Sequence, residues 1–161
     1  MSDWDVPDVV AAVLTDTRAR ERTLFGGFCP DCSGQVTATL TVPDGPTLAE
    51  AVSETETPVP LGEATGDDRF PHVEFTCSRC RRSRTRFVGT AALRHPVGEA
   101  FLVEGGVDLD AEAYPWRYID DPAVVESTDP LRVRAGLAVD GDHLSVVVDA
   151  DAQVIDTTQE D

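Results

Sequence analysis

The chain has 161 residues, enough for one domain or two small ones that share a core, and its apolar fraction of 41% is that of a globular protein. No run of about 18 apolar residues occurs, which excludes a membrane-spanning helix. The start MSDWDVPDVV is acidic and lacks the features of a signal peptide, so we expect a cytoplasmic protein.

The charge is unusual in two respects. Thirty acidic residues against thirteen basic ones give a formal net charge of -17, and every basic residue is arginine. In molar salt the Debye length shrinks to about 3 Å, so carboxylates spread over a surface hardly repel one another. An acidic chain without lysine therefore favours a salt-adapted, halophilic source. This is an inference about habitat and not about fold.

The first predicted segment, residues 1–22, is an amphipathic helix over residues 5–22. Asp5 can cap its start, and arginines lie toward its end, where cations suit the helix dipole. Helical spacing gathers one stripe of side chains: Val6, Val9, Val10, Val13, Leu14 and Thr17. The stripe packs either on its own chain or against a second copy. A homodimer through helix 5–22 is therefore one expectation.

Four cysteines form two Cys-x-x-Cys pairs in the second predicted segment, residues 23–89. Each pair is predicted at the tip of a hairpin, with TLFGGF and FPHVEFT as the strands that lead in and alternating strands that lead out. Residues 29–40 and 77–88 thus look like one unit used twice. Four thiolates in two pairs can surround one Zn²⁺ tetrahedrally, and such a closed shell leaves no position for substrate. The pattern predicts a zinc ribbon with one structural Zn²⁺ on Cys29, Cys32, Cys77 and Cys80.

Two features complicate this site. The gap between the pairs exceeds the usual ribbon spacing, and its extra length, residues 43–69, is predicted to be a polar insertion. His72 is close enough in sequence to Cys77 to be a spare ligand, but four cysteines already complete the shell. The alternative interpretation is a Cys-x-x-Cys dithiol redox or metal-responsive protein. Turn and strand residues follow Cys29 where a redox dithiol would have a helix, which favours zinc.

Positive charge is concentrated directly after the second cysteine pair. Five arginines fall within eight positions: Arg79, Arg81, Arg82, Arg84 and Arg86. On a strand, Arg82, Arg84 and Arg86 share one face, and we expect them to point outward, so that their replacement costs little stability. Three roles are open for them. They form a solvated face neutralised by nearby carboxylates, they bind the phosphates of nucleic acid, or they contact an acidic protein partner.

The third predicted segment, residues 90–161, is an α+β domain. His95-Pro96 is expected to break a helical stretch into a short turn and a helix over residues 96–104. The aromatic run that follows predicts core positions for Tyr114, Trp116 and Tyr118.

Alternating apolar residues over 131–139 and 144–148 flank an Asp140-Gly141 hairpin signal. With AVVES before them and Val154 after them, they predict an antiparallel meander of three or four strands, covered by helix 96–104. The predicted fold class is therefore α+β. It has an N-terminal helix, a zinc ribbon of two Cys-x-x-Cys hairpins, then a helix and a C-terminal antiparallel β-meander.

Motifs of catalysis are missing from the sequence. It has no Gly-rich phosphate loop, no nucleophile elbow and no His-Glu-x-x-His motif. We therefore expect that the protein is not an enzyme.

The order of these elements resembles the C-terminal zinc-ribbon half of haloarchaeal ArsR-like winged-helix transcription regulators. The resemblance covers about residues 9–157 and is carried by CPDC at 29–32, CSRC at 77–80, HPVGEAFLVEGGVD at 95–108, YPWRYID at 114–120, STDPLRVRAGLAVDGD at 127–142 and LSVVVD at 144–149. The family's DNA-reading winged helix has no counterpart here. The resemblance implies a zinc-ribbon accessory or regulatory protein that acts by binding DNA or a protein partner.

Overall fold

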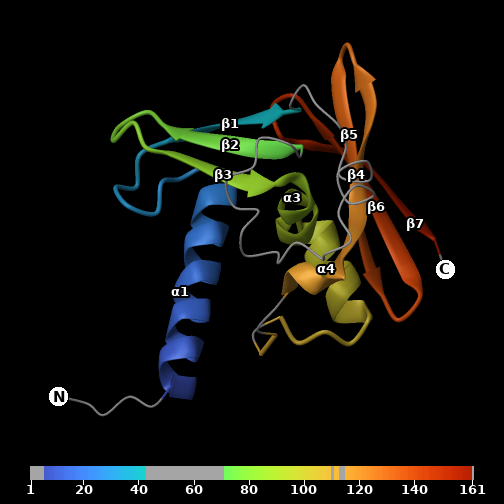
Figure 1. The fold of residues 1–161 in the computed structure, drawn as a ribbon, viewed down its shortest axis with the longest axis horizontal. Coiled ribbons are helices and arrows are strands. Elements are labelled where there is room, and N and C mark those ends of the chain that lie inside the picture. Colours follow the sequence, from blue (N-terminus) through green and yellow to red (C-terminus); the bar gives the residue numbers. More distant parts are fainter. Residues whose placement is uncertain (1–5, 43–70, 110, 113–114, 161) are drawn as a thin grey trace, which may run out of the picture.

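The computed structural model describes residues 6–109, 111–112 and 115–160, except for residues 43–70, and it confirms the α+β class (Figure 1). The predicted insertion at 43–69 lies outside the described residues. The N-terminal part contains α1 (Val6–Phe25), β1 (Val36–Thr41), β2 (His72–Cys77) and β3 (Ser83–Phe87). The C-terminal part contains α3 (Val88–Arg94), α4 (Pro96–Glu104), the 3₁₀ helix η1 (Pro115–Tyr118), β4 (Ile119–Thr128), β5 (Leu131–Val139), β6 (Asp142–Asp149) and β7 (Val154–Glu160).

The strands form two antiparallel sheets. The ribbon sheet has the order β1-β2-β3, and the meander has the order β4-β5-β6-β7. The predicted meander is thus confirmed with four strands. At the Asp140-Gly141 hairpin both residues have positive φ, 53° and 102°, as the tight turn between twisted strands requires.

Helix α3 lies between the two sheets in Figure 1 and is the most buried helix. Its residues Val88 to Leu93 are all buried, whereas α4 buries Gly98, Phe101 and Leu102. The predicted short turn before His95 is therefore a full helix, and α3 shares with helix 96–104 the task of covering the meander. Its small residues explain this, because they let a helix fit between two sheets.

Apolar side chains of both sheets and of α3 join in one cluster. A hydrogen bond from the Leu40 N–H to the Ala150 carbonyl, 2.9 Å long, also connects the ribbon sheet to the turn between β6 and β7. The ribbon is therefore built onto the meander and is supported by it. Among the described residues, no helix combines the length and the apolar character needed to cross a bilayer.

Helix α1 continues to Phe25, three residues beyond its predicted end. The predicted strand TLFGGF is therefore wrong: it is the last helical turn followed by Gly26 and Gly27, and one bridge between Phe28 and Gln35 is all the pairing it makes. Packing explains the difference. Leu24 is 3% exposed, and the Phe25 ring meets Phe75 edge-on with 4.9 Å between centroids. The predicted cap, Asp5, lies outside the described residues.

The aromatic run is less buried than predicted. Trp116 is 43% exposed, so its predicted place in the core is wrong, whereas Tyr118 is partly buried and packs against the core. Tyr114 lies outside the described residues. The run forms η1 and not a strand, and one turn of helix cannot direct all its side chains to one side.

Candidate metal centre

The first knuckle, residues 29–34, closes on itself through its backbone. The N–H of Cys29 donates to the Gly34 carbonyl, and the N–H of Ser33 donates to the Cys29 carbonyl, both at 2.8 Å. Ser33 has a φ of 57°, which turns the chain sharply after the second cysteine.

The second knuckle, residues 77–82, has the same design. The N–H of Cys77 donates to the Arg82 carbonyl at 3.0 Å, and the N–H of Arg81 donates to the Cys77 carbonyl at 3.1 Å. Arg81 has a φ of 61° and occupies the place of Ser33 in the first knuckle. The predicted repeat is therefore confirmed over the two knuckles and the strands β1 and β3 that follow them.

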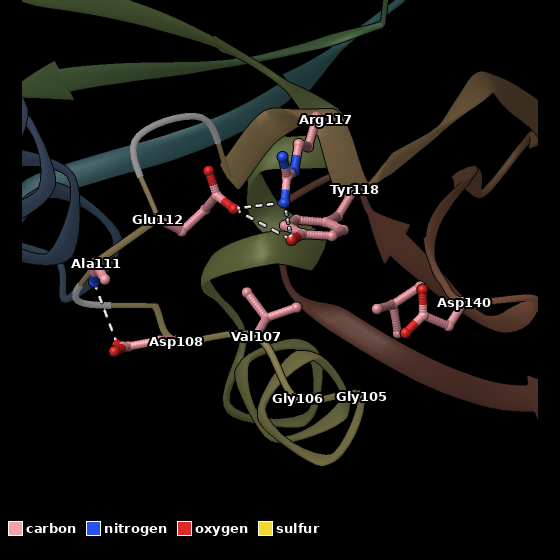
Figure 2. A pocket seen from close by; sticks show the side chains of 10 residues that line it. Gly105, Gly106, Val107, Asp108, Ala111, Glu112, Arg117, Tyr118 and Asp140 are labelled. Atoms are coloured by element: carbon pink, nitrogen blue, oxygen red, sulfur yellow. Dashed lines mark hydrogen bonds and ion pairs between the residues drawn. The ribbon is translucent and has the colours of Figure 1, made fainter.

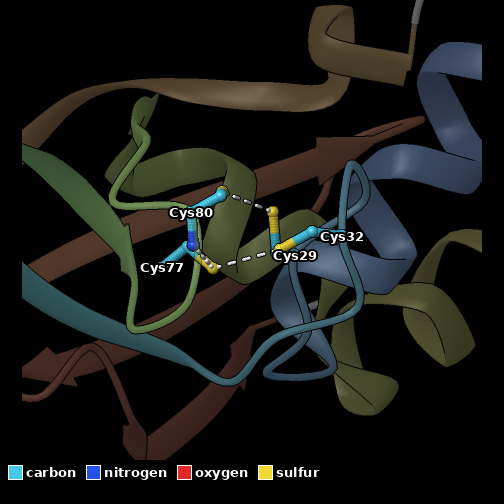
Figure 3. Close-up of side chains that lie close together, drawn as sticks. All are labelled: Cys29, Cys32, Cys77 and Cys80. Atoms are coloured by element: carbon cyan, nitrogen blue, oxygen red, sulfur yellow. Dashed lines mark hydrogen bonds between the residues drawn. The ribbon is translucent and has the colours of Figure 1, made fainter.

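The knuckles face each other and bring four sulfurs together (Figure 3). Cys29 Sγ lies 3.7 Å from Cys80 Sγ, and Cys32 Sγ lies 3.5 Å from Cys77 Sγ. All four sulfurs lie within 4.8 Å of one another. A tetrahedral site with Zn–S bonds of about 2.3 Å has edges of about 3.8 Å. The four predicted ligands thus form a group of the right size and donor type for a metal ion.

The surroundings of the sulfurs favour ligation. The N–H groups of Cys80 and Arg79 donate to Cys77 Sγ at 3.5 and 3.4 Å, and they lower the pKa of Cys77 to about 6 against the effect of burial. For Cys80, the N–H of Arg82 lowers the pKa, but burial and hydrogen bonds with the other thiols outweigh it and raise the pKa to about 11. The pKa values of Cys77 and Cys80 are therefore shifted in opposite directions. A bound cation favours the ionised form of both, because metal ligation stabilises thiolates.

Burial makes the centre a closed one. Cys29 is 2% exposed and Cys77 1% exposed, while the other two cysteines are half-buried. His72, which is close to Cys77 in sequence, stands at the far end of β2, roughly 16 Å from Cys77 at about 3.3 Å per residue, and takes no part in the centre. An extended strand separates residues that are close in sequence.

Gly34 allows the knuckles to approach. A Cβ atom at this position would lie 2.6 Å from the Arg79 Cβ, 3.1 Å from Cys77 Sγ and 3.4 Å from Cys32 Sγ. The Arg79 guanidinium also donates to the Cys32 carbonyl at 3.1 Å. One predicted arginine therefore braces the first knuckle against the second.

Two other arginines of the predicted set lie on the covered face of the ribbon sheet. Arg84 pairs with Phe75 and Arg86 with Val73, and residues opposite each other in a sheet share a face. Val73 is fully buried and Phe75 is 3% exposed. The prediction that these guanidinium groups point outward is wrong. Alternation identifies residues that share a face, but it cannot tell which face the rest of the chain covers.

Asp31, in the middle of the first knuckle, gathers three guanidinium groups. Its carboxylate lies 2.6 Å from Arg84, 3.2 Å from Arg82 and 3.3 Å from Arg20 of α1. The hydrogen bond from Arg84 is the main cause that lowers the pKa of Asp31, and burial opposes it. This contact has a sequence signal, because Asp31 stands inside the Cys-x-x-Cys motif.

Glu21 of α1 gathers two more guanidinium groups. Its carboxylate lies 3.4 Å from Arg86 and 2.9 Å from Arg94, whose side chain is 4% exposed. Glu21 and Arg94 are 73 positions apart, and no sequence motif predicts their ion pair. In the part of the chain that the structure describes, Arg81 is the member of the predicted five whose side chain forms no hydrogen bond or ion pair. Most of the arginine cluster thus meets the chain's own carboxylates.

A hollow lies beside η1, and Figure 2 shows the polar residues that line it. The Glu112 carboxylate accepts hydrogen bonds from Tyr118 at 3.1 Å and pairs with Arg117 at 2.8 Å. Asp108 accepts a hydrogen bond from the Ala111 N–H. Among the described residues that line the hollow, these polar groups satisfy one another, so the hollow carries no argument for a ligand.

Comparison with known families identifies one match. The family model described as a domain of unknown function (DUF7351) matches residues 1–154. No curated protein and no solved structure matches the chain.

Proposed function

The chain belongs to the DUF7351 family, and on that premise we propose that it is a zinc-stabilised binding module, an accessory or regulatory protein without catalytic activity. The observation that carries this is the group of four sulfurs within 4.8 Å of one another, presented by two knuckles of the same geometry. Four thiolates are the donor set that structural zinc sites use.

The role of the metal is to hold the knuckles together. Cys29 and Cys32 would hold it from one side, and Cys77 and Cys80 from the other. Zn²⁺ supplies charge neutralisation and four bonds, which replace a core that so small a sheet cannot build. A shell of four protein ligands has no open position, so the centre supports a surface and not a reaction.

The redox alternative finds less support in the geometry. The redox dithiol considered for this sequence stands at a helix N-terminus, which lowers the pKa of its thiol. Here the first knuckle leads into β1 and the second into β3, so neither pair starts a helix. The two shortest sulfur contacts also join cysteines of different pairs.

The surface that remains favours a protein partner over DNA. Arg84 and Arg86 lie on the covered face and pair with Asp31 and Glu21. Of the three arginines predicted to share one face, Arg82, with a side chain that is 66% exposed, remains available to a phosphate. Phosphate binding also weakens as a power of the salt concentration, which matters for a chain of charge -17 in a salt-adapted source. The resemblance to regulators supports a role in gene regulation through such a partner.

Helix α1 carries three exposed valines of the predicted stripe. Val9 and Val10 are each 46% exposed and Val13 is 58% exposed. In Figure 1 this end of the helix extends away from both sheets. A second copy brings the same uncharged stripe, so it matches by two-fold symmetry, and molar salt screens the repulsion between two acidic chains. We therefore take a second copy of the chain as its partner.

Light scattering in molar salt tests this contact. We expect the full chain to be a dimer, and the double variant Val10→Asp, Val13→Asp to be a monomer, because two buried carboxylates in the contact cost more than the stripe contributes. Val124→Asp serves as the control, since Val124 is an equally exposed valine on β4. A monomeric unmutated chain, or a double variant that stays dimeric, would reject the contact.

A further inference from the structure

We infer that Asp31 couples the metal centre to the position of α1, so that the metal state of the four cysteines controls how the partner-binding helix is held. The inference rests on the proposed function, because it needs a metal at that centre. Its evidence is independent of the sulfurs: it comes from the contacts of one carboxylate, from the anchoring of one helix and from a glycine pair between helix and knuckle.

Asp31 connects three parts of the fold: the first knuckle, α1 and β3. It stands between Cys29 and Cys32, so the backbone on both of its sides is fixed when those sulfurs bind a metal. Its side chain is 18% exposed and contacts Arg20 of α1 and, beyond the second knuckle, Arg84 of β3. A displacement of the first knuckle therefore separates the carboxylate from both guanidinium groups.

The other contacts of α1 are concentrated at its C-terminal end. Leu24 and Phe25 pack against the core, and Glu21 pairs with Arg94 of α3. The exposed stripe lies at the opposite end. With a rise of about 1.5 Å per residue, Val6 stands about 20 Å along the axis from Arg20. A small rotation at the anchored end therefore moves the stripe by several times the displacement at Arg20.

Between α1 and the first knuckle the chain has the backbone of a hinge. Gly26 and Gly27 follow the last helical residue directly, and Gly27 has a φ of 86° with open space where a side chain would be. Glycine adopts this region without strain, and no side chain fixes the angle from outside. Backbone hydrogen bonds join this segment to both of its neighbours, because the Phe28 N–H donates to the Thr23 carbonyl of α1 and the Val36 N–H donates to the Gly27 carbonyl, both at 3.0 Å. The direction of α1 is therefore set by these bonds together with the side-chain contacts of the helix.

The metal decides whether these contacts persist. A metal shared by the four sulfurs would join the two knuckles, and within the first knuckle Cys29 is the only buried residue. When the metal leaves, the knuckles separate and Asp31 releases Arg20, whereas α1 keeps the contacts of Glu21, Arg22, Leu24 and Phe25. Metal binding and the position of α1 are then thermodynamically linked, so that a change in one shifts the other.

Amide hydrogen exchange, measured on the full chain with zinc bound, tests the coupling. We expect Asp31→Asn and Arg20→Gln each to keep one zinc per chain while the amides of residues 14–25 exchange about threefold faster, because a partly screened ion pair is lost. Asp16→Asn is the matched control. Asp16 pairs with the same guanidinium at 2.6 Å, but it lies on α1 itself and leaves the knuckle contact intact.

Chelation completes the test. Removal of zinc from the unmutated chain should accelerate exchange in residues 14–25 while β5 and β6 stay protected, and in Asp31→Asn the additional acceleration should be smaller. Unchanged exchange in zinc-bound Asp31→Asn, or equal loss of protection in β5 and β6 on chelation, overturns the coupling alone. A chain that never binds zinc overturns the proposed function and the coupling together.

Discussion

At the scale of single residues, Gly34 decides how closely the two knuckles approach. It is the point where the first knuckle touches the second, and its missing Cβ leaves the space that Arg79 and Cys77 occupy. The corresponding residue of the second knuckle is Arg82, whose Cβ meets no such crowding. The repeated unit therefore needs glycine in one copy and tolerates a long side chain in the other.

Replacing Gly34 by alanine should weaken the metal centre. The added Cβ would lie 2.6 Å from the Arg79 Cβ, so the knuckles must move apart and the sulfur positions with them. We expect a loss of about 1–3 kcal/mol in the free energy of unfolding, the usual cost of overpacking, together with weaker zinc binding in a chelator competition. Gln35→Ala changes the next, exposed residue and should leave both quantities unchanged. Equal behaviour of the two variants would show that this approach is not tight.

At the scale of elements, β3 differs from β1 although both follow the same knuckle. Where β1 places Val36 and Ala38, β3 places Arg84 and Arg86. These guanidinium groups lie on the covered face, and there they meet the carboxylates of Asp31 and Glu21. The substitution of charge for apolar groups thus connects the sheet to α1 and to the first knuckle.

Replacement of Arg84 and Arg86 should therefore cost stability. We expect Arg84→Gln and Arg86→Gln each to lower the free energy of unfolding by about 1–2 kcal/mol, because each leaves a half-buried carboxylate with fewer partners. Arg81→Gln, from the same cluster but without a side-chain partner among the described residues, should change it by less than about 0.5 kcal/mol. Denaturant unfolding measures all three. If all three variants lowered the free energy of unfolding by the same small amount, the prediction that the arginines of β3 face outward would be favoured instead.

This element also shows what a sequence can and cannot predict. The cysteine spacing predicted that the four cysteines come together, and strong local signals predicted β2, the meander and its Asp140-Gly141 turn, because each depends on neighbours in the chain. The face of Arg84 and the pair of Glu21 with Arg94 depend on segments far apart in sequence. The end of α1 likewise follows from the contact of Phe25 with Phe75 and not from helix propensity.

At the scale of the whole molecule, the apolar cluster and the candidate metal centre stabilise different parts of the fold. The cluster joins the meander, α3 and the inner face of the ribbon sheet, and it ends before the knuckles are reached. Beyond it, the knuckles are held by backbone hydrogen bonds, by the arginine contacts and, on our proposal, by a metal on the four sulfurs. The proposal thus describes an apolar core with a metal-dependent extension, and α1 contacts both.

The zinc content of the chain tests the central claim most directly. Protein purified under reducing conditions and without added metal should contain one zinc per chain by elemental analysis, and Cys77→Ser should contain none, because three thiolates no longer close the shell. Ser78→Ala, at the neighbouring position, should keep its zinc. A reduced chain without zinc that forms a reversible Cys29–Cys32 disulfide on oxidation would contradict the account and favour the dithiol interpretation.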